Sequence, residues 1–236
     1  MRFHHADAIW HDFPELAAGV LAADGLSSQA TVDEPVARYL AIARSRLDGR
    51  TESGLPEIQA WRRAFSRMGL KPTQYRCASE ALLRRFRKED ALPRLHPLVD
   101  ACNAISLAFA IPVAVFDVAG IDGDLAVRRA IGDEDYLTFS GEHEHPEPGE
   151  VIFADEVGQV HARRWSNRQS GRSAVATPTT SALIVAEAMH ESAAKDVTEL
   201  VAALSEEISA AWSVKPESAI LSQAAPRFDF RPLGNA

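Results

Sequence analysis

The sequence predicts an α+β fold in which helices flank a mainly antiparallel sheet. Three observations predict it. Apolar residues recur at helical spacing before about residue 109 and again after about residue 180. Between these segments they alternate at every second position, and the Gly- and Asp-rich turn at 120–124 indicates a short connection between strands. We therefore expect residues 110–178 to form the sheet and residues 33–109 and 180–212 to supply the helices.

The N-terminal half is predicted to contain one strand followed by four helices. The first helix has a capping residue, Asp33, and a proline two positions later, Pro35, which fits the first turn of a helix. Its apolar residues recur every three or four positions, which places them on one face. The expected elements are a strand at 16–22 and helices at 33–47, 56–68, 79–88 and 97–109.

The second half is predicted to contain six strands and two closing helices. Thr177, Thr179 and Thr180 precede the first closing helix, so we expect one of them to be its N-cap. Residues 1–213 are predicted to form one domain, and residues 214–236, rich in Pro, Ser and Ala, a loosely held tail. The expected strands lie near 111–118, 125–130, 136–139, 150–154, 159–165 and 173–177, with an acidic loop at 141–149 and helices at 180–191 and 196–212.

The composition is that of an ordinary globular protein. The chain has 236 residues, of which 46% are hydrophobic and 25% are charged. Its start lacks the basic and apolar pattern of a secretion signal, and no apolar run approaches the roughly 20 residues that span a bilayer. We therefore expect a cytoplasmic protein with no membrane segment. The sequence carries no signal of an oligomeric state.

The cysteines and histidines do not form a recognisable metal motif. Cys77 and Cys102 belong to no CxxC pair and have no activating partner nearby in the sequence, so both are expected to be reduced, unreactive thiols. The segment His143-Glu144-His145 would need a third ligand from elsewhere. His161 and His190 are expected to be exposed or partly buried, with no special task. We predict neither a metal nor another cofactor.

The net charge is −8, but the basic residues are concentrated in two segments. Residues 62–88 carry nine Lys or Arg and one acid, and residues 163–172 carry four Arg and no acid. A basic stripe on an acidic body can bind a phosphate backbone at one place, although solvated helix faces would give the same pattern. The residues that we expect to contact RNA are Arg84, Arg85, Arg168 and Gln169.

Three polar segments carry a resemblance to a known family. They are YRCASEALLRR at 75–85, HPLVDACNAIS at 96–106, and GEVIFAD at 149–155 with its continuation through RWSNRQS at 164–170 to TPTT at 177–180. In this order and at these separations they resemble the B3/B4 domain, the tRNA-editing domain of the phenylalanyl-tRNA synthetase β subunit, and more closely its free-standing relatives. The resemblance covers residues 10–213, and it implies the fold of that domain.

The resemblance also implies a function. In the synthetase this domain hydrolyses tyrosine wrongly esterified to the phenylalanine tRNA. The resemblance therefore implies that this chain is a free-standing deacylase that acts on aminoacylated tRNA in trans. Nothing in the chain resembles the synthetase's catalytic subunit, so we expect no aminoacylation by this chain alone. The alternatives are a non-catalytic module that binds RNA or a free amino acid, and a hydrolase of another ester or of a D-aminoacyl adduct.

One predicted helix presents a candidate catalytic group. Asp100 and Asn103 stand three residues apart and share a face, and His96 lies near the N-terminal end of that face. The resemblance implies that this helix lines the editing pocket. A carboxylate, an amide and an imidazole there could hold an aminoacyl group or orient a water molecule. Asp100 in the first turn has the alternative role of stabilising the helix start.

The remaining candidates are expected to bind the substrate. A glutamate in a matching GE pair recognises the substrate side chain in the family, which implies this role for Glu150; an exposed acid at the start of a strand is the alternative. Arg76 and Glu80 are four apart and either pair with each other or contact the substrate. One of Thr177 and Thr179 is expected to face the pocket. Ester hydrolysis needs a positioned water and donors for the oxyanion, and it needs no covalent nucleophile.

Overall fold

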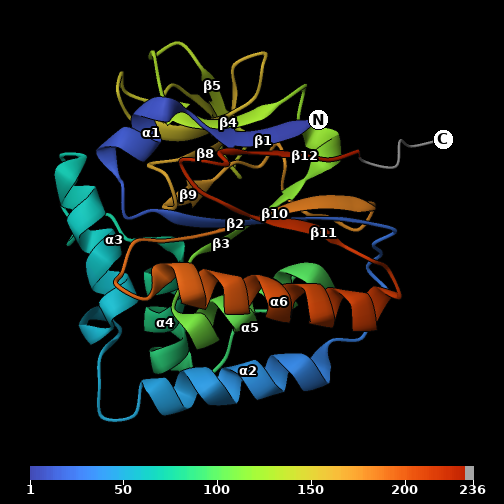
Figure 1. Ribbon diagram of the computed structural model, residues 1–236. Coiled ribbons are helices and arrows are strands. Elements are labelled where there is room, and N and C mark those ends of the chain that lie inside the picture. The colour runs from blue at the N-terminus through green and yellow to red at the C-terminus, as the bar shows by residue number, and fades with distance from the viewer. Residues whose placement is uncertain (232–236) are drawn as a thin grey trace.

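The computed structural model describes residues 1–231 and consists of two stacked sheets with a layer of helices beneath them (Figure 1). The eight-stranded sheet is called sheet A and the four-stranded sheet is called sheet B. Sheet B lies in the middle, between sheet A and helices α5 (Pro97–Phe109) and α6 (Ala193–Trp212). Helix α2 (Asp33–Arg46) covers the outer side of α5.

Sheet B is fully antiparallel, and its two central strands are nearly continuous apolar runs. Its order is β11-β2-β10-β3, and Val20 of β2 pairs with Val185 of β10. Because both of its faces are covered, nearly every side chain of the two central strands is buried. Helix α6 packs on β2 so closely that a Cβ at Gly19 would clash with Val197 and Val201. The strands are β2 (Ala17–Asp24), β3 (Val113–Asp117), β10 (Ser181–Ala188) and β11 (Glu217–Leu221).

Sheet A has the order β12-β1-β4-β7-β8-β5-β6, with β9 paired to β8. Two of its pairings are parallel, β1 with β4 and β5 with β8, and the others are antiparallel. The strands are β1 (Arg2–His5), β4 (Leu125–Arg129), β5 (Asp135–Leu137), β6 (His143–Glu144), β7 (Val151–Ala154), β8 (Gln159–Arg163), β9 (Arg168–Gln169) and β12 (Arg227–Asp229). The predicted α+β class with mainly antiparallel pairing is confirmed.

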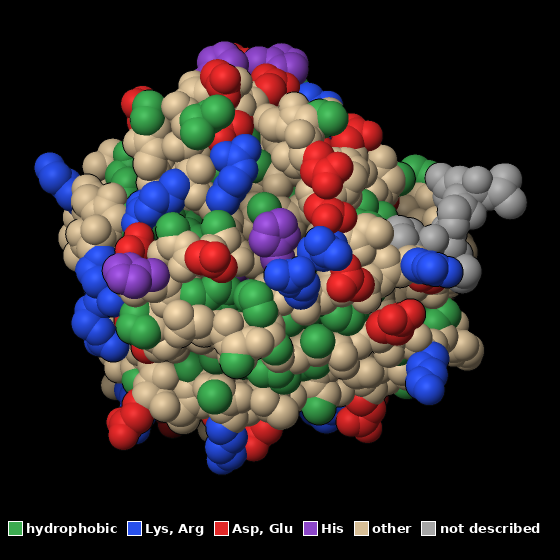
Figure 2. All heavy atoms as spheres, turned by 45° about the horizontal axis from the view of Figure 1, so that its top comes forward, with side chains coloured by type: hydrophobic (Ala, Val, Ile, Leu, Met, Phe, Trp, Pro, Cys, Tyr) green, Lys and Arg blue, Asp and Glu red, His purple; other side chains and the backbone are tan. Residues whose placement is uncertain are grey.

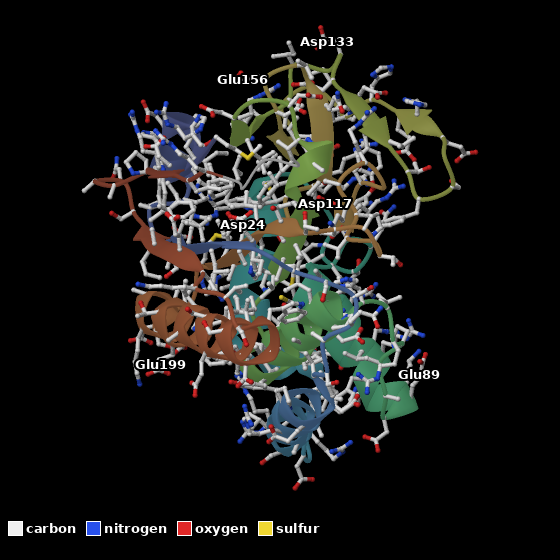
Figure 3. The ribbon with its side chains drawn as sticks, turned by 90° about the vertical axis from the view of Figure 1, so that its right-hand side faces the viewer. Asp24, Glu89, Asp117, Asp133, Glu156 and Glu199 are labelled. Atoms are coloured by element: carbon white, nitrogen blue, oxygen red, sulfur yellow. The ribbon has the colours of Figure 1, made fainter. Side chains whose placement is uncertain are left out.

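The other helices lie at the ends and sides of these layers (Figure 1). They are α1 (Asp7–Asp12), α3 (Pro56–Arg67) and α4 (Ala78–Glu89), with short 3₁₀ turns at Glu52–Gly54 and Val118–Gly120. Figure 3 shows Asp24 and Asp117 at the level of sheet B, Asp133 and Glu156 on the outer loops of sheet A, and Glu89 and Glu199 on the helices. None of the helices in residues 1–231 is long and apolar enough to cross a membrane.

The predicted strand at 16–22 and five predicted helices are confirmed, with ends shifted by a few residues. Prolines at the first helical position begin α3 and α5, as expected. The predicted helix at 180–191 is wrong, because this segment is the central strand β10. The sequence of this strand, SALIVAEA, is almost entirely apolar, because a strand that is covered by a layer on each face has no solvent-exposed side. Thr179 therefore caps no helix.

Three further expectations are corrected. The strands of residues 110–178 do not form one sheet, because β3 joins sheet B and the others join sheet A. No strand forms at 173–177, and the short β9 occurs instead at Arg168–Gln169. The segment after residue 213 is not loosely held in the part described, since β11 pairs with β2 and β12 pairs with β1. Residues 232–236 of that segment lie outside the described residues.

Candidate functional site

A cavity opens between sheets A and B. Its empty volume, counting the part open to solvent, is about 430 Å³. Apolar side chains from both sheets line it, among them Val113 on β3, Phe153 on β7 and Val185 on β10. The polar lining comes from residues 166–169 and from the carboxylate of Glu187 on β10. An apolar hollow with a few fixed polar groups is the usual form of a small-molecule site.

The Glu187 carboxylate is held rigidly at this cavity. Its Oε1 lies 2.6 Å from Nε2 of His5 and accepts a hydrogen bond of 2.9 Å from Nε1 of Trp165. Its side chain is 5% exposed, and the backbone carbonyl of Glu187 accepts a further bond from Nε1 of Trp61. Within residues 1–231 no hydrogen bond reaches the second oxygen, Oε2. A buried carboxylate with a free oxygen favours a bound cation or donor.

The backbone is strained just before the polar segment. Arg164 and Trp165 both have positive φ values, 47° and 58°, which bulky side chains rarely adopt. Trp165 is fully buried, and its amide donates to the carbonyl of Val151 at 2.7 Å. The next residue, Ser166, lines the cavity, and its buried hydroxyl has no hydrogen-bond partner in the described part of the chain. Strain beside an unpartnered polar group is typical of functional loops.

The neighbouring amides are fixed by contacts with other elements. Asn167 donates from Nδ2 to the carbonyl of Arg76 at 2.7 Å, and Gln169 donates from Nε2 to the carbonyl of Val115 at 2.6 Å. Each bond leaves the side-chain carbonyl oxygen of the amide as an acceptor. The polar segment therefore presents preorganised groups at the cavity.

Two predicted catalytic residues lie at a different hollow. Asn103 and Asp100 of α5 line an open depression between α2 and α5, with an empty volume of about 700 Å³ including open solvent. Asn103 is partly exposed and makes no hydrogen bond within residues 1–231. Sheet B and α5 separate this hollow from the cavity between the sheets (Figure 1).

Asp100 and His96 stabilise the start of α5. Asp100 accepts a hydrogen bond of 3.0 Å from the amide of Leu95, just before the helix. His96 is the N-cap, and its Nδ1 accepts from the amide of Leu98 at 3.2 Å. Burial lowers the pKa of His96, and the Asp100 carboxylate offsets only part of this effect. Asp100 thus stabilises the start of the helix, which is the alternative role that the sequence suggested for it.

Glu150 is engaged within sheet A. Its two oxygens accept from Nε and Nη2 of Arg163, each at 2.9 Å, and Oε1 also accepts from the amide of Arg164. Burial alone would raise the pKa of Glu150, but the Arg163 hydrogen bond and charge outweigh it and hold the pKa below its usual range. The side chain is 6% exposed, so in this state Glu150 has no free surface for a substrate.

Of the other predicted substrate-binding residues, Glu80 and Thr179 are engaged with other protein groups. Glu80 is buried and pairs with Arg62 at 2.5 Å and with Arg76 at 3.6 Å, which is one of the two roles that the sequence left open. Thr179 is buried and donates to Oδ2 of Asp117 at 2.6 Å. Thr177 is exposed.

The arginines that were predicted to contact RNA differ in whether an acidic side chain already pairs with them. Arg84 is exposed and makes no ion pair within residues 1–231, whereas Arg85 pairs with Glu89 at 2.8 Å. Arg168 lines the cavity and pairs with Glu144 at 3.0 Å. On the face drawn in Figure 2, basic and acidic side chains are interspersed. Folding therefore neutralises part of the basic stripe that the linear sequence shows.

The cysteines are inert in the folded chain. Cys77 and Cys102 are both buried, and burial raises the pKa of each thiol to about 12. A thiol with this pKa is protonated at neutral pH and is a poor nucleophile. The histidines of the acidic loop are bound locally: Nδ1 of His143 lies 2.6 Å from Asp135, and Nδ1 of His145 lies 2.8 Å from the carbonyl of Glu134.

The family model for the B3/4 domain matches residues 60–215, which include every lining residue of the cavity. The chain belongs to the B3/4 domain family. The resemblance to the B3/B4 domain that was inferred from the sequence is confirmed.

A solved structure is also similar to this B3/4 domain. It is the crystal structure of an N-terminal fragment of the phenylalanyl-tRNA synthetase β-subunit from Pyrococcus horikoshii, with 9% identity and a TM-score of 0.49. The match covers 92% of this chain and 53% of that chain, so this chain spans about half the length of the fragment. No curated protein matches the chain.

Sequence reasoning missed two buried histidine–carboxylate pairs of this B3/4 domain. One is the pair of His5 and Glu187, whose only sequence signal is a single acid inside an apolar run. The other is His161, which is fully buried rather than exposed and lies between Asp155 at 3.2 Å and Ser173 at 2.9 Å. This second group resembles a catalytic triad in composition, but Ser173 is fully buried, so the arrangement is structural.

Proposed function

We propose that this B3/4 domain hydrolyses the ester of aminoacylated tRNA and that the reaction takes place in the cavity between sheets A and B. One observation carries the proposal: the cavity combines an apolar wall with a fixed, buried carboxylate and an unpartnered hydroxyl. These are the groups that an esterified amino acid needs. The apolar wall suits a side chain, the carboxylate suits an α-ammonium group, and the hydroxyl can donate to a carbonyl oxygen.

The reaction is chemically simple. A water oxygen adds to the ester carbonyl carbon, the bond from that carbon to the ribose oxygen breaks, and a proton from the water passes to the ribose oxygen. In the proposed site Glu187 Oε2 binds the ammonium group, and the Ser166 hydroxyl rotates to donate to the developing oxyanion. One such donor is worth on the order of a hundred- to a thousandfold in rate. The ribose hydroxyl beside the ester can position the water.

The tRNA is proposed to approach through exposed cations. Arg84 has no ion-pair partner within residues 1–231, and Arg168 at the cavity can exchange Glu144 for a phosphate. Gln169 at the same segment stays a proposed contact. The hollow at Asn103 and Asp100 remains the competing location, because the sequence resemblance points to that helix and Asn103 makes no hydrogen bond to any residue that the structure describes.

A non-catalytic binding module is the second candidate, and one observation favours it. Asn167, Arg168 and Gln169 at the cavity are each held by other protein groups. Among residues 1–231, Glu187 is the one acid that lines the cavity and could act as a base for water. A site of this kind can retain an amino acid or a tRNA end without turning it over. Binding and turnover are separable by experiment.

A deacylation screen tests the proposal. Purified protein is incubated with a panel of correctly and wrongly charged tRNAs, and the loss of the aminoacyl ester is followed against spontaneous hydrolysis. We expect accelerated hydrolysis of at least one member and a lower rate with Ser166→Ala. Tight binding of charged tRNA with no acceleration for any member would replace the hydrolase with the binding module.

A further inference from the structure

A second cluster of chemically active groups lies where three elements meet. Glu57 is at the start of α3, His190 follows the end of β10, and Asp196 is in the first turn of α6. Each offers one ligand atom, and these atoms lie within 4.8 Å of one another. None of the three lines the cavity between the sheets. Glu57 lies far in the sequence from His190 and Asp196, so no local spacing motif reveals the cluster.

Two atoms of this cluster are buried without a partner. Oε2 of Glu57 and Nδ1 of His190 are both shielded from solvent and make no hydrogen bond to any of residues 1–231. The residues are 6% and 5% exposed, so water does not compensate for them at the surface. A buried carboxylate oxygen without a donor is costly, and the cost disappears when a cation binds it.

The surrounding contacts hold the three groups in place. Nε2 of His190 lies 2.8 Å from Oδ2 of Asp196, which also accepts from the hydroxyl of Ser192 at 2.7 Å. Arg46 donates to Oε1 of Glu57 at 2.6 Å, which leaves Oε2 free and fixes the plane of the carboxylate. Hydrogen bonds of this kind orient ligands around metal ions.

The donor set selects the kind of ion. One imidazole nitrogen with carboxylate oxygens suits a divalent transition metal such as Zn²⁺ better than Mg²⁺ or Ca²⁺. Donors around tetrahedral zinc stand about 3.3 Å apart, so a spacing of up to 4.8 Å closes by small side-chain rotations. Asp196 is 25% exposed and gives the ion a path from solvent.

We propose that Glu57, His190 and Asp196 bind one divalent transition-metal ion. The ion takes the place of the hydrogen between Nε2 of His190 and Oδ2 of Asp196, and the neutral imidazole then carries its hydrogen on Nδ1. The Arg46 guanidinium keeps its bond to Oε1 of Glu57 and offsets part of the negative charge. The ion links the start of α3 to the junction of β10 and α6. This site is independent of the proposed hydrolysis, because it lies outside the cavity.

Zn²⁺ binding to the full-length chain tests the proposal. Metal-free protein is titrated with Zn²⁺ by calorimetry, and the melting temperature is measured with and without the ion. We expect one ion per chain and a rise in Tm of about 5 °C or more at a Zn²⁺ concentration a hundred times Kd. Asp196→Asn and Glu57→Gln should each weaken binding at least about tenfold.

The matched control is Glu199→Gln. Glu199 lies on the same helix as Asp196, on its outer side in Figure 3, and its one ion pair within residues 1–231 is with Lys195. This variant should bind Zn²⁺ as the wild type does. If Glu57→Gln fails to fold because Arg46 loses its partner, Asp196→Asn decides the question. Zn²⁺ binding that is absent in the wild type, or unchanged in Asp196→Asn, would overturn the proposal.

Discussion

Replacing Glu187 by Gln tests the role of the buried carboxylate at the cavity. The change keeps the size of the side chain and removes its charge. In the wild type Oε1 is bonded to both His5 and Trp165, at 2.6 Å and 2.9 Å. A hydrogen bond to a charged group contributes about 1 kcal/mol more than a neutral one, so two weakened bonds cost about 2 kcal/mol. For a chain of this size Tm should fall by roughly 4–8 °C.

The same variant should affect the substrate. If the free oxygen of Glu187 binds the α-ammonium group, KM for a charged tRNA rises roughly tenfold or more, while kcat changes less. Initial rates at several tRNA concentrations separate the two parameters, and a thermal melt reports the folded fraction. An unchanged KM in well-folded Glu187→Gln would refute the assignment of the ammonium site to this carboxylate.

Asp155→Asn is the matched control for Glu187→Gln. Asp155 is an equally buried carboxylate bonded to a histidine, His161, but it does not line the cavity. Burial alone would raise the pKa of Asp155, and the hydrogen bonds from His161 and from backbone amides outweigh it and lower the pKa. We expect Asp155→Asn to lower Tm and to leave KM unchanged. A similar rise in KM in both variants would indicate general loosening instead.

Three further outcomes follow from the structure. Cys77 and Cys102 should resist alkylation at pH 8 in the native state and react only after denaturation, since burial raises both pKa values to about 12; labelling of either native thiol would contradict this. Burial lowers the pKa of His96 in the folded state, so its contribution to stability is present above about pH 6.5 and is lost as the pH falls through the lower folded pKa. His96→Asn, which keeps an N-cap side chain, should therefore lose less unfolding free energy than the wild type between pH 7 and pH 5, measured by urea titration; equal losses would exclude His96 as the cause. If tRNA binds through exposed cations, its affinity should fall steeply with salt. Arg84→Glu should weaken binding without lowering Tm, and Arg168→Glu, which also loses the Glu144 pair, should weaken binding without unfolding the protein; binding insensitive to salt and to both changes would remove the predicted RNA contacts.

The elements predicted best were those with a local signal. Prolines at the first helical position set the starts of α3 and α5, and the periodic stripe of α6 placed it correctly. The run at 181–188 was misread because a strand covered on both faces loses the alternation that identifies strands. The split into two sheets depends on long-range pairing, which periodicity does not report.

The candidate site was harder to predict for a similar reason. His5 and Glu187 are 182 residues apart, and only the pairing of β2 and β10 within sheet B and the packing of sheet A on it bring them together. Glu150 and Glu80 looked like pocket acids in the sequence, yet arginines from other elements occupy them. The segment 164–170, by contrast, is one of the polar segments that carry the family resemblance in the sequence, and residues 165–169 of it line the cavity.

The most direct test of the central claim is the rate of aminoacyl-tRNA hydrolysis by metal-free protein, compared among the wild type, Ser166→Ala and Asn103→Ala. Ser166 lines the cavity between the sheets, and Asn103 lines the hollow between α2 and α5. We predict that the wild type hydrolyses at least one charged tRNA and that Ser166→Ala lowers kcat by about a hundredfold or more, while folded Asn103→Ala keeps most of its rate. If Asn103→Ala loses the hydrolysis rate and Ser166→Ala keeps it, the active site is the hollow between α2 and α5 instead. A wild type that leaves every charged tRNA intact would contradict the hydrolase itself.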